Sequence, residues 1–338
     1  MKFNERRIYA TFDGRSRTPL PALAEALLNR QQRDWPQLAA GYAALDMRRE
    51  RWLTAGDLSV LLQCNPQRVV STSANTDPAA IKRRPCFLCL ANLPAGQQAI
   101  LYHRHFFVLC NPFPIVSRHY TIAHREHLPQ ALHGVIPKLL QLARDFHPDY
   151  ALLYNGPQSG ASAPDHRHFQ ALPKASIPAL NEVGQHITKV CEKNGVALYK
   201  QIDGARTAWQ VEGENAKDIA VLMRLLLRAM RRLQAPLGDT LQKKVSPLHA
   251  EPMLNLFCLY AAGRWRVMIF PRRQHRPSAY YKSGEEQILV SPGAVDMGGV
   301  LVLPREVDYN RLDAALLMNI FQEISLGEAI MDEIVAAL

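Results

Sequence analysis

Short apolar segments that end in proline occur twice in this chain, and this arrangement restricts its fold more than any other feature. The segment HFFVLCNPFPIVSRH (residues 105–119) and the segment WRVMIFPRRQHRP (residues 265–277) each run from an apolar strand candidate into proline and then into basic residues or histidine. Proline cannot donate a backbone hydrogen bond within a sheet, so each strand should stop there. The repetition suggests a divergent duplication that produces two related halves.

Helical patterns accompany these strands. Residues 20–50 predict a helix that is broken at Pro36, residues 130–146 predict a helix after the first strands, and residues 311–338 predict one closing amphipathic helix. Short strands in tandem that are followed by a helix are typical of antiparallel sheets with covering helices. We therefore expect an α+β fold. Its expected parts are a helical N-terminal extension (1–57), a first half (58–180) and a second half (181–338).

The charge and hydropathy of the 338 residues limit the partners. The net charge of +10 favours anionic partners, either phosphorylated small molecules or nucleic acid. The chain has no signature of a nucleic-acid-binding domain, so nucleic acid is not expected as a partner. No apolar run approaches the roughly 20 residues needed to cross a bilayer. Because the start, MKFNERRIYATFDG, also lacks the apolar core of a secretory signal, we expect a cytoplasmic protein that does not contact the membrane.

A glycine- and serine-rich segment stands directly before two histidines and a glutamine at two-residue spacing. It reads NGPQSGASAPDHRHFQALP (residues 155–173) and contains His166, His168 and Gln170. If this part is extended, the three side chains share one face. The loop can offer backbone N–H groups to phosphate oxygens, a neutral imidazole is a nucleophile toward phosphorus, and a carboxamide can donate a hydrogen bond to a phosphoryl oxygen. The combination predicts group transfer at phosphorus, whereas two histidines at this spacing alone are more often structural.

The same residues resemble a known family. The segment NGPQSGASAPDHRHFQ is similar to the active-site segment of the HIT superfamily in its transferase branch, which includes galactose-1-phosphate uridylyltransferase, diadenosine tetraphosphate phosphorylase and GDP-hexose phosphorylases. The signature His-x-His-x-Gln is met by His166, His168 and Gln170, and the hydrolase branch carries a third histidine in place of the glutamine. The resemblance covers about residues 58–175 well and 250–305 more faintly, and the segment SPGAVDMGGVLVLPRE is similar to a bacterial branch of the group. It implies a HIT-like fold with two related halves.

The resemblance implies a nucleotidyltransferase or phosphorylase that acts on a nucleotide sugar or a dinucleoside polyphosphate. His168 would attack the α-phosphorus of the donor to form a nucleotidyl-histidine, Gln170 would stabilise this intermediate, and phosphate or a sugar phosphate would resolve it. The residues that would bind the substrate are Asn155, Ser159, Gly160 and Ser162. Ser162 departs from the family because it lies four residues before His166 rather than three. Related transferases often complete their sites across a dimer, so a homodimer is expected.

Two arginines outside the loop are further candidates for substrate binding. Arg68 follows Asn-Pro-Gln at the end of a strand candidate and could contact the base or phosphate of the donor. Arg272 follows the strand of the second half and could hold the phosphate of the acceptor. The alternative for each is an ordinary surface charge.

Cys86 and Cys89 have the spacing that suits two thiolates on one tetrahedral zinc ion. Uridylyltransferases of the family often add a downstream histidine and the first histidine of the signature, which implies His166 and a histidine of AHREHLP. The Leu-Pro that follows selects His124, whereas strand register selects His127, which we favour because register is harder to shift than loop length. The zinc would be structural. A redox pair and two ordinary buried cysteines are the alternatives.

Two other functions remain open on the same residues. One is a hydrolase of dinucleoside polyphosphates, against which Gln170 argues. The other is a non-catalytic protein that binds nucleotides or nucleic acid on the same fold. The sequence specifies neither the base, the sugar nor the acceptor.

Overall fold

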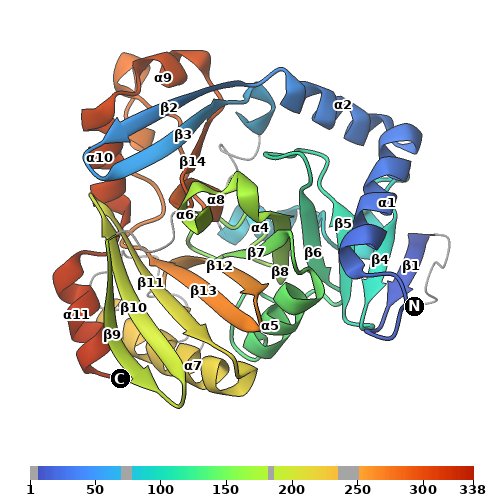
Figure 1. Ribbon diagram of the computed structural model, residues 1–338. Helices are drawn as coiled ribbons and strands as arrows, with labels where there is room; N and C mark the ends of the chain where they lie inside the picture. The colour runs from blue at the N-terminus through green and yellow to red at the C-terminus, as the bar shows by residue number, and fades with distance from the viewer. Residues whose placement is uncertain (1–6, 70–77, 182–185, 235–250) are drawn as a thin grey trace.

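The computed structural model describes residues 7–69, 78–181, 186–234 and 251–338. A sheet of eleven strands runs through the molecule, and a sheet of three strands lies beside it (Figure 1). The large sheet contains, in spatial order, β1 (Ile8–Phe12), β4 (Ala99–Tyr102), β5 (Phe106–Cys110), β6 (Tyr120–His124), β8 (His168–Pro173), β7 (Tyr150–Asn155), β12 (Leu254–Ala261), β13 (Arg264–Pro271), β11 (Arg206–Gly213), β10 (Val196–Asp203) and β9 (Ile187–Lys193). The small sheet contains β14 (Val300–Leu303), β3 (Leu58–Cys64) and β2 (Arg49–Ala55). Within the large sheet only β1 and β4 are parallel, so the predicted antiparallel α+β fold is confirmed.

The two halves of the large sheet have the same topology. The first contains β4, β5 and β6, then α5 (Ile136–Asp145), then β7 and β8; the second contains β9, β10 and β11, then α7 (Ala216–Gln234), then β12 and β13. Counted outward from the junction of β7 with β12, the orders are β7-β8-β6-β5-β4 and β12-β13-β11-β10-β9. The prediction of two related halves is thus confirmed. The match between residues 105–119 and residues 265–277 was wrong, however. The first segment contains β5, which corresponds to β10, and the second contains β13, which corresponds to β8.

Helices cover the face of the large sheet that lies opposite the side chains of His168 and Gln170. The covering helices are α1 (Leu20–Asp34), α5, α7 and α11 (Glu328–Ala336). Leu139 of α5 and Met223 of α7 share one apolar core with Phe169 of β8. Because side chains alternate along a strand, His168 and Gln170 face the opposite side. That side carries the small sheet together with α6 (Pro178–Asn181), α8 (Ala294–Met297), α9 (Glu306–Arg311) and α10 (Ala314–Ile324).

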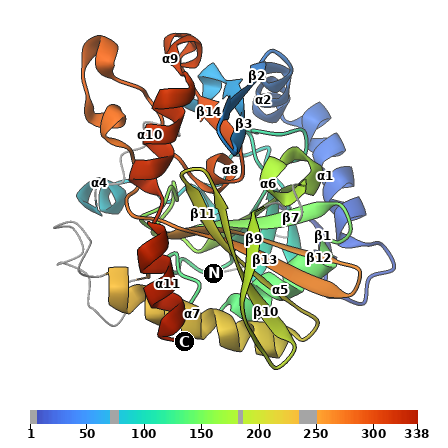
Figure 2. The same ribbon diagram turned by 60° about the vertical axis from the view of Figure 1, so that its left-hand side comes forward.

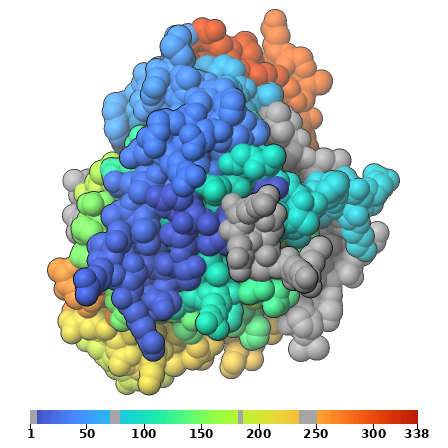
Figure 3. Space-filling model, turned by 90° about the vertical axis from the view of Figure 1, so that its right-hand side faces the viewer, coloured from blue at the N-terminus to red at the C-terminus, as the bar shows by residue number. Residues whose placement is uncertain are grey.

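The N-terminal residues join both sheets. The predicted helix does break at Pro36, since α1 ends at Asp34 and α2 (Pro36–Asp46) begins at the proline. The range is not only helical, because β1 pairs with β4 of the large sheet and β2 forms a hairpin with β3. Figure 1 shows α2 running between the small sheet and α1, and Figure 3 shows these residues covering one side of the molecule. The division of the chain at residues 57 and 180 stays a prediction.

The predicted closing helix is divided into α10 and α11, which Figure 2 shows one after the other along one side, with α11 against α7. The break has a tertiary cause. The carbonyl of Ile324 at the end of α10 accepts hydrogen bonds from Arg272 Nε and from the backbone N–H of Arg273. Within the described residues, no helix is both long and apolar enough to cross a membrane. A short α4 (Pro78–Arg83) precedes the two neighbouring cysteines.

Candidate active site

A cavity of about 710 Å³ lies on the face of the large sheet that carries His168 and Gln170. Its polar lining includes Arg68, Arg84, Asn155, Ser162, His168 and Gln170, and Gly160 adds backbone. Its apolar lining includes Leu88, Leu93, Leu109, Phe113 and Ile115. Residues 291 and 293–296 of the second half form another part of the wall. The cavity therefore combines apolar walls with polar and cationic side chains.

His168 presents a defined nitrogen to this cavity. The side chain is 4% exposed, and its Nδ1 lies 2.8 Å from the carbonyl oxygen of His166, so Nδ1 carries the proton and donates it. Nε2 then keeps its lone pair and has no partner in the part of the chain that the structure describes. Burial lowers the pKa of His168 to about 4. The imidazole is thus neutral near pH 7, which is the form that can attack phosphorus.

Gln130 fixes the backbone on which this histidine stands. Its side-chain oxygen accepts a hydrogen bond from the N–H of His168 at 2.8 Å, and its amide nitrogen donates to the carbonyls of His168 and Asn155, both at 3.0 Å. Gln130 is 3% exposed. It joins the end of β7 to the start of β8, and no feature of the sequence singled it out.

Gln170 is oriented by His119. The Nε2 atom of His119 lies 2.7 Å from Oε1 of Gln170, while its Nδ1 lies 3.3 Å from the backbone nitrogen of Ile115. A backbone N–H must donate, so Nδ1 of His119 accepts and Nε2 carries the proton that is donated to Gln170. The amide N–H groups of Gln170 are then directed away from His119, and Gln170 lines the cavity. Burial lowers the pKa of His119 to about 4, which keeps this tautomer uncharged.

The loop after β7 brings only part of the predicted phosphate cradle to the cavity. Asn155 lines it, and its Oδ1 accepts from Asn255 Nδ2 at 2.8 Å and from the N–H of Ala294 at 2.7 Å, which leaves its amide nitrogen as a donor. Gly160 has φ +91°, and a Cβ there would lie 2.9 Å from the backbone of the neighbouring segment. Glycine is therefore required at this position. Ser159 is fully buried and does not line the cavity, so its predicted contact with substrate is not supported.

The two predicted arginines have different positions. Arg68 lines the cavity, its Nη1 donates to the carbonyl of Phe113 at 2.9 Å, and the carboxylate of Asp296 lies near enough to raise its pKa against the lowering effect of burial. Burial raises the pKa of Asp296 to about 6.

Arg272 is a correction to the prediction. It is 1% exposed, lies outside the cavity lining, and all five of its N–H groups donate to protein acceptors. The acceptors are the carbonyls of Gln274, His275, Pro292 and Ile324 and the side chain of Asn255. A guanidinium has no sixth donor for a phosphate. Arg272 therefore holds the framework of the second half and does not bind the acceptor.

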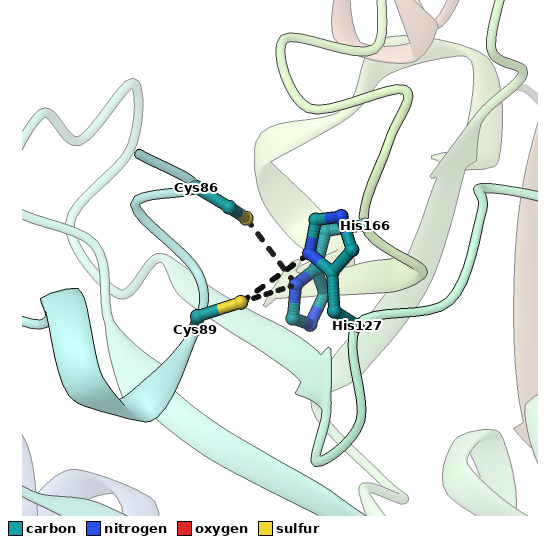
Figure 4. A group of neighbouring side chains, drawn as sticks. All are labelled: Cys86, Cys89, His127 and His166. Atoms are coloured by element: carbon teal, nitrogen blue, oxygen red, sulfur yellow. Dashed lines mark hydrogen bonds between the residues drawn. The ribbon is translucent and has the colours of Figure 1, made fainter. Parts of the chain in front are cut away.

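The two cysteines and two histidines predicted as metal ligands lie together (Figure 4). The potential ligand atoms of Cys86, Cys89, His127 and His166 are all within 4.8 Å of one another. His166 Nδ1 is 3.3 Å from Cys86 Sγ and 3.6 Å from Cys89 Sγ, and His127 Nδ1 is 3.3 Å from Cys89 Sγ. Zinc–sulfur bonds of about 2.3 Å and zinc–nitrogen bonds of about 2.0 Å in a tetrahedron place ligand atoms roughly 3.3–3.8 Å apart. The donor set and its spacing fit a metal ion.

The hydrogen bonds around the cluster leave the nitrogen of His166 that faces the cysteines free to bind a metal ion. His166 Nε2 lies 2.8 Å from the carbonyl oxygen of His124, so Nε2 carries the proton and Nδ1 is free to bind a metal. The side chain of His124 is not part of this cluster, and its Nδ1 accepts from the N–H of Glu126 at 3.0 Å. The geometry therefore selects His127, as strand register indicated. Burial raises the pKa of Cys86 to about 11, so its thiolate form requires a neighbouring cation.

Two family models match separate parts of the chain. Residues 27–173 match the Domain of unknown function (DUF4922), and residues 223–337 match the GDPGP1-like, C-terminal domain. A comparison with curated proteins gives no match.

Solved structures of yeast Ap4A phosphorylase Apa2 share the fold. One crystal structure has a TM-score of 0.51 at 15% identity, over 86% of this chain and 94% of that chain. The complex with AMP has a TM-score of 0.55 at 13% identity, over 90% and 96%. The complex with Ap4A has a TM-score of 0.53 at 13% identity, over 86% and 96%. At these identities the likeness is one of fold.

Proposed function

We propose that the protein is a nucleotidyltransferase that works as a phosphorylase on a dinucleoside polyphosphate or a nucleotide sugar through a covalent intermediate on His168. The observation that carries this proposal is the neutral imidazole of His168, with an unprotonated Nε2, on the wall of a cavity that also presents Gln170 and two arginines. The match to a GDPGP1-like domain and the fold of yeast Ap4A phosphorylase, solved with AMP and with Ap4A, support the same substrate classes.

The reaction would proceed in two displacements. Nε2 of His168 attacks the α-phosphorus of the donor, a P–N bond forms, and the bond from phosphorus to the bridging oxygen breaks with its electron pair leaving on the departing phosphate. An oxygen of phosphate or of a sugar phosphate then attacks the same phosphorus, and the P–N electron pair returns to Nε2. The amide N–H of Gln170 donates to a non-bridging oxygen as charge develops.

The cluster of Cys86, Cys89, His127 and His166 would hold a structural zinc ion, which supplies a rigid anchor rather than chemistry at the donor. His166 belongs to the cluster, and its carbonyl accepts the proton of His168 Nδ1. Ligation of His166 would therefore fix the tautomer of the nucleophile. A cytoplasmic location and a homodimer remain predictions.

A labelled donor tests the covalent mechanism. The zinc-loaded protein is incubated with Ap4A or with GDP-hexoses and UDP-hexoses that carry label in the α-phosphate, and is denatured in alkali because a phosphoramidate hydrolyses in acid. Label should remain on the wild type, be absent from His168→Ala, and leave on addition of phosphate. A donor that is consumed without phosphate and without labelled protein would instead support a dinucleoside polyphosphate hydrolase. Nucleotide binding without turnover of any donor would support a non-catalytic role.

A further inference from the structure

Arg84 lines the cavity, whereas the two basic residues directly before it do not. It follows α4, lines the cavity, and its Nη2 donates to Asp165 Oδ1 at 2.9 Å and to the carbonyl of Ser162 at 3.2 Å. Its guanidinium carbon also lies 5.0 Å from the centre of the Phe87 ring. Lys82 and Arg83 directly before it are exposed and do not line the cavity. The structure therefore selects one residue of a basic triplet.

One nitrogen of this guanidinium is left without an acceptor among the described residues. Arg84 Nη1 is buried and has no hydrogen-bond partner among the described residues, although Nη2 of the same group has two. A buried, charged nitrogen without a partner is unfavourable, and an anionic oxygen that the side chain turns to meet in the cavity would satisfy it. Contacts with Asp165 and with the Phe87 ring support the side chain beside the cavity.

Arg68 and Arg84 are anchored on separate parts of the wall. Arg68 is held at Phe113 and has an electrostatic effect on His119, the residue that orients Gln170. Arg84 is held at the loop that contains Ser162. We propose that Arg84 forms a subsite for the phosphate of the departing group, while Arg68 and Gln170 act on the phosphate that is transferred. This inference rests on the proposed function and restricts the donor to compounds with at least two linked phosphates.

The subsite is connected to the metal cluster through one carboxylate. Asp165 accepts from Arg84 with Oδ1, and its Oδ2 lies 3.8 Å from Nε2 of His127. Asp165 is also the residue before His166. The metal ligands and Arg84 therefore share one support, and loss of that support should weaken binding of the second phosphate more than binding of the first.

Binding measured without turnover tests the subsite. In the zinc-loaded His168→Ala protein, titration calorimetry compares AMP with ADP and GMP with GDP, so that the gain from the second phosphate is measured directly. Arg84→Gln should weaken binding of the diphosphate about 10- to 100-fold, as expected for a charge-assisted hydrogen bond, and change the monophosphate less than about twofold. Asp165→Asn, which keeps the cation but removes the negative charge that anchors it, should lose part of the same gain.

Arg83→Gln is the matched control, because it removes the same charge one residue away and should leave both affinities unchanged. Zinc content and thermal unfolding show that each variant is folded. An equal loss for mono- and diphosphate, or no loss for the diphosphate, would overturn the assignment of Arg84 while leaving the proposed function intact. If the His168→Ala protein binds no nucleotide at all, the proposed function fails and this inference fails with it.

Discussion

Replacing His119 by leucine removes the donor that holds the side-chain oxygen of Gln170. The Nε2–Oε1 distance is 2.7 Å and His119 is fully buried, so leucine at this position leaves Oε1 without the donor that fixes its direction. Gln170 can then rotate by half a turn about its last bond and direct its oxygen, instead of its N–H groups, toward the phosphate. We expect His119→Leu to slow formation of the nucleotidyl-histidine and to leave the binding of donor nearly unchanged.

The size of the effect follows from two limits. Loss of one neutral hydrogen bond of about 1–1.5 kcal/mol corresponds to a factor of roughly 10 in the fraction of correctly oriented Gln170. Complete loss of the donor in Gln170→Ala should cost about 10²–10³ in kcat, as for other donors to a developing oxyanion. The rate of His119→Leu should therefore fall between these limits. In a Gln170→Ala background the same replacement should cost less than about threefold, since it has no amide left to orient.

Single-turnover labelling of the protein measures this cycle, with pre-steady-state rates compared in wild type, both single variants and the double variant. His119 Nδ1 also accepts from the N–H of Ile115, so urea unfolding must show that each variant is folded at the assay temperature. If the two losses simply multiply, or if His119→Leu raises KM and leaves kcat unchanged, His119 does not act through Gln170.

Zinc analysis of two variants tests which histidine is the third metal ligand. His127→Ala should bind well below one metal ion per chain, whereas His124→Ala should retain its metal. Loss of metal only in His124→Ala would contradict the geometry. Acid should destabilise the protein partly through His119, because burial lowers its folded pKa from the ordinary 6.5 to about 4, so that the unfolded chain binds a proton that the folded chain does not. Between pH 7 and pH 4, His119→Gln should therefore lose about 3 kcal/mol less unfolding free energy than wild type in urea titrations, and parallel curves would refute this. Gly160→Ala should destabilise the protein by more than Gly195→Ala, for which about 1 kcal/mol is expected. Both positions have positive φ, but only at Gly160 would the new Cβ meet the backbone of another segment. Thermal unfolding that ranks the two variants in the reverse order would count against this.

Local signals predicted the layers of the fold, and tertiary contacts decided the rest. Pro36 breaks the first helix in the sequence and in the structure, because the proline lacks the N–H that a continuous helix needs. The closing helix was predicted as one because its apolar periodicity continues past residue 325. Its break depends on Arg272 and Arg273, which approach the carbonyl of Ile324 from a distant strand, and no local pattern contains that information.

The site shows the same division between local and distant causes. Spacing correctly placed His168 and Gln170 on one face, because both lie within β8. It did not place His166 there: the strand begins at His168, and His166 turns toward the cysteines. The tautomer of His168 and the orientation of Gln170 depend on a carbonyl oxygen and on His119, neither of which a sequence motif specifies. Arg272 had the right charge and position in the chain, but its contacts with the framework were not visible in the sequence.

The two halves of the large sheet have the same topology but share one site. Counted back from the prolines that end β8 and β13, His168 corresponds to Arg266, and the guanidinium of Arg266 pairs with Glu212 of β11 at 2.7 Å. The second half therefore has no nucleophile at this place. It contributes structure instead, since Asn255 and the N–H of Ala294 hold the side chain of Asn155 and residues 293–296 form part of the cavity wall.

Separation of the halves should therefore abolish the site even though every predicted catalytic residue lies in the first half. A fragment that ends at residue 180 retains His168 and Gln170 but loses both partners of Asn155 Oδ1 and one part of the wall. It also leaves β7 as an open edge, because β12 pairs with β7 from Cys258 to Asn255. The second half was retained, on this reasoning, because the first half cannot enclose a nucleotide without it.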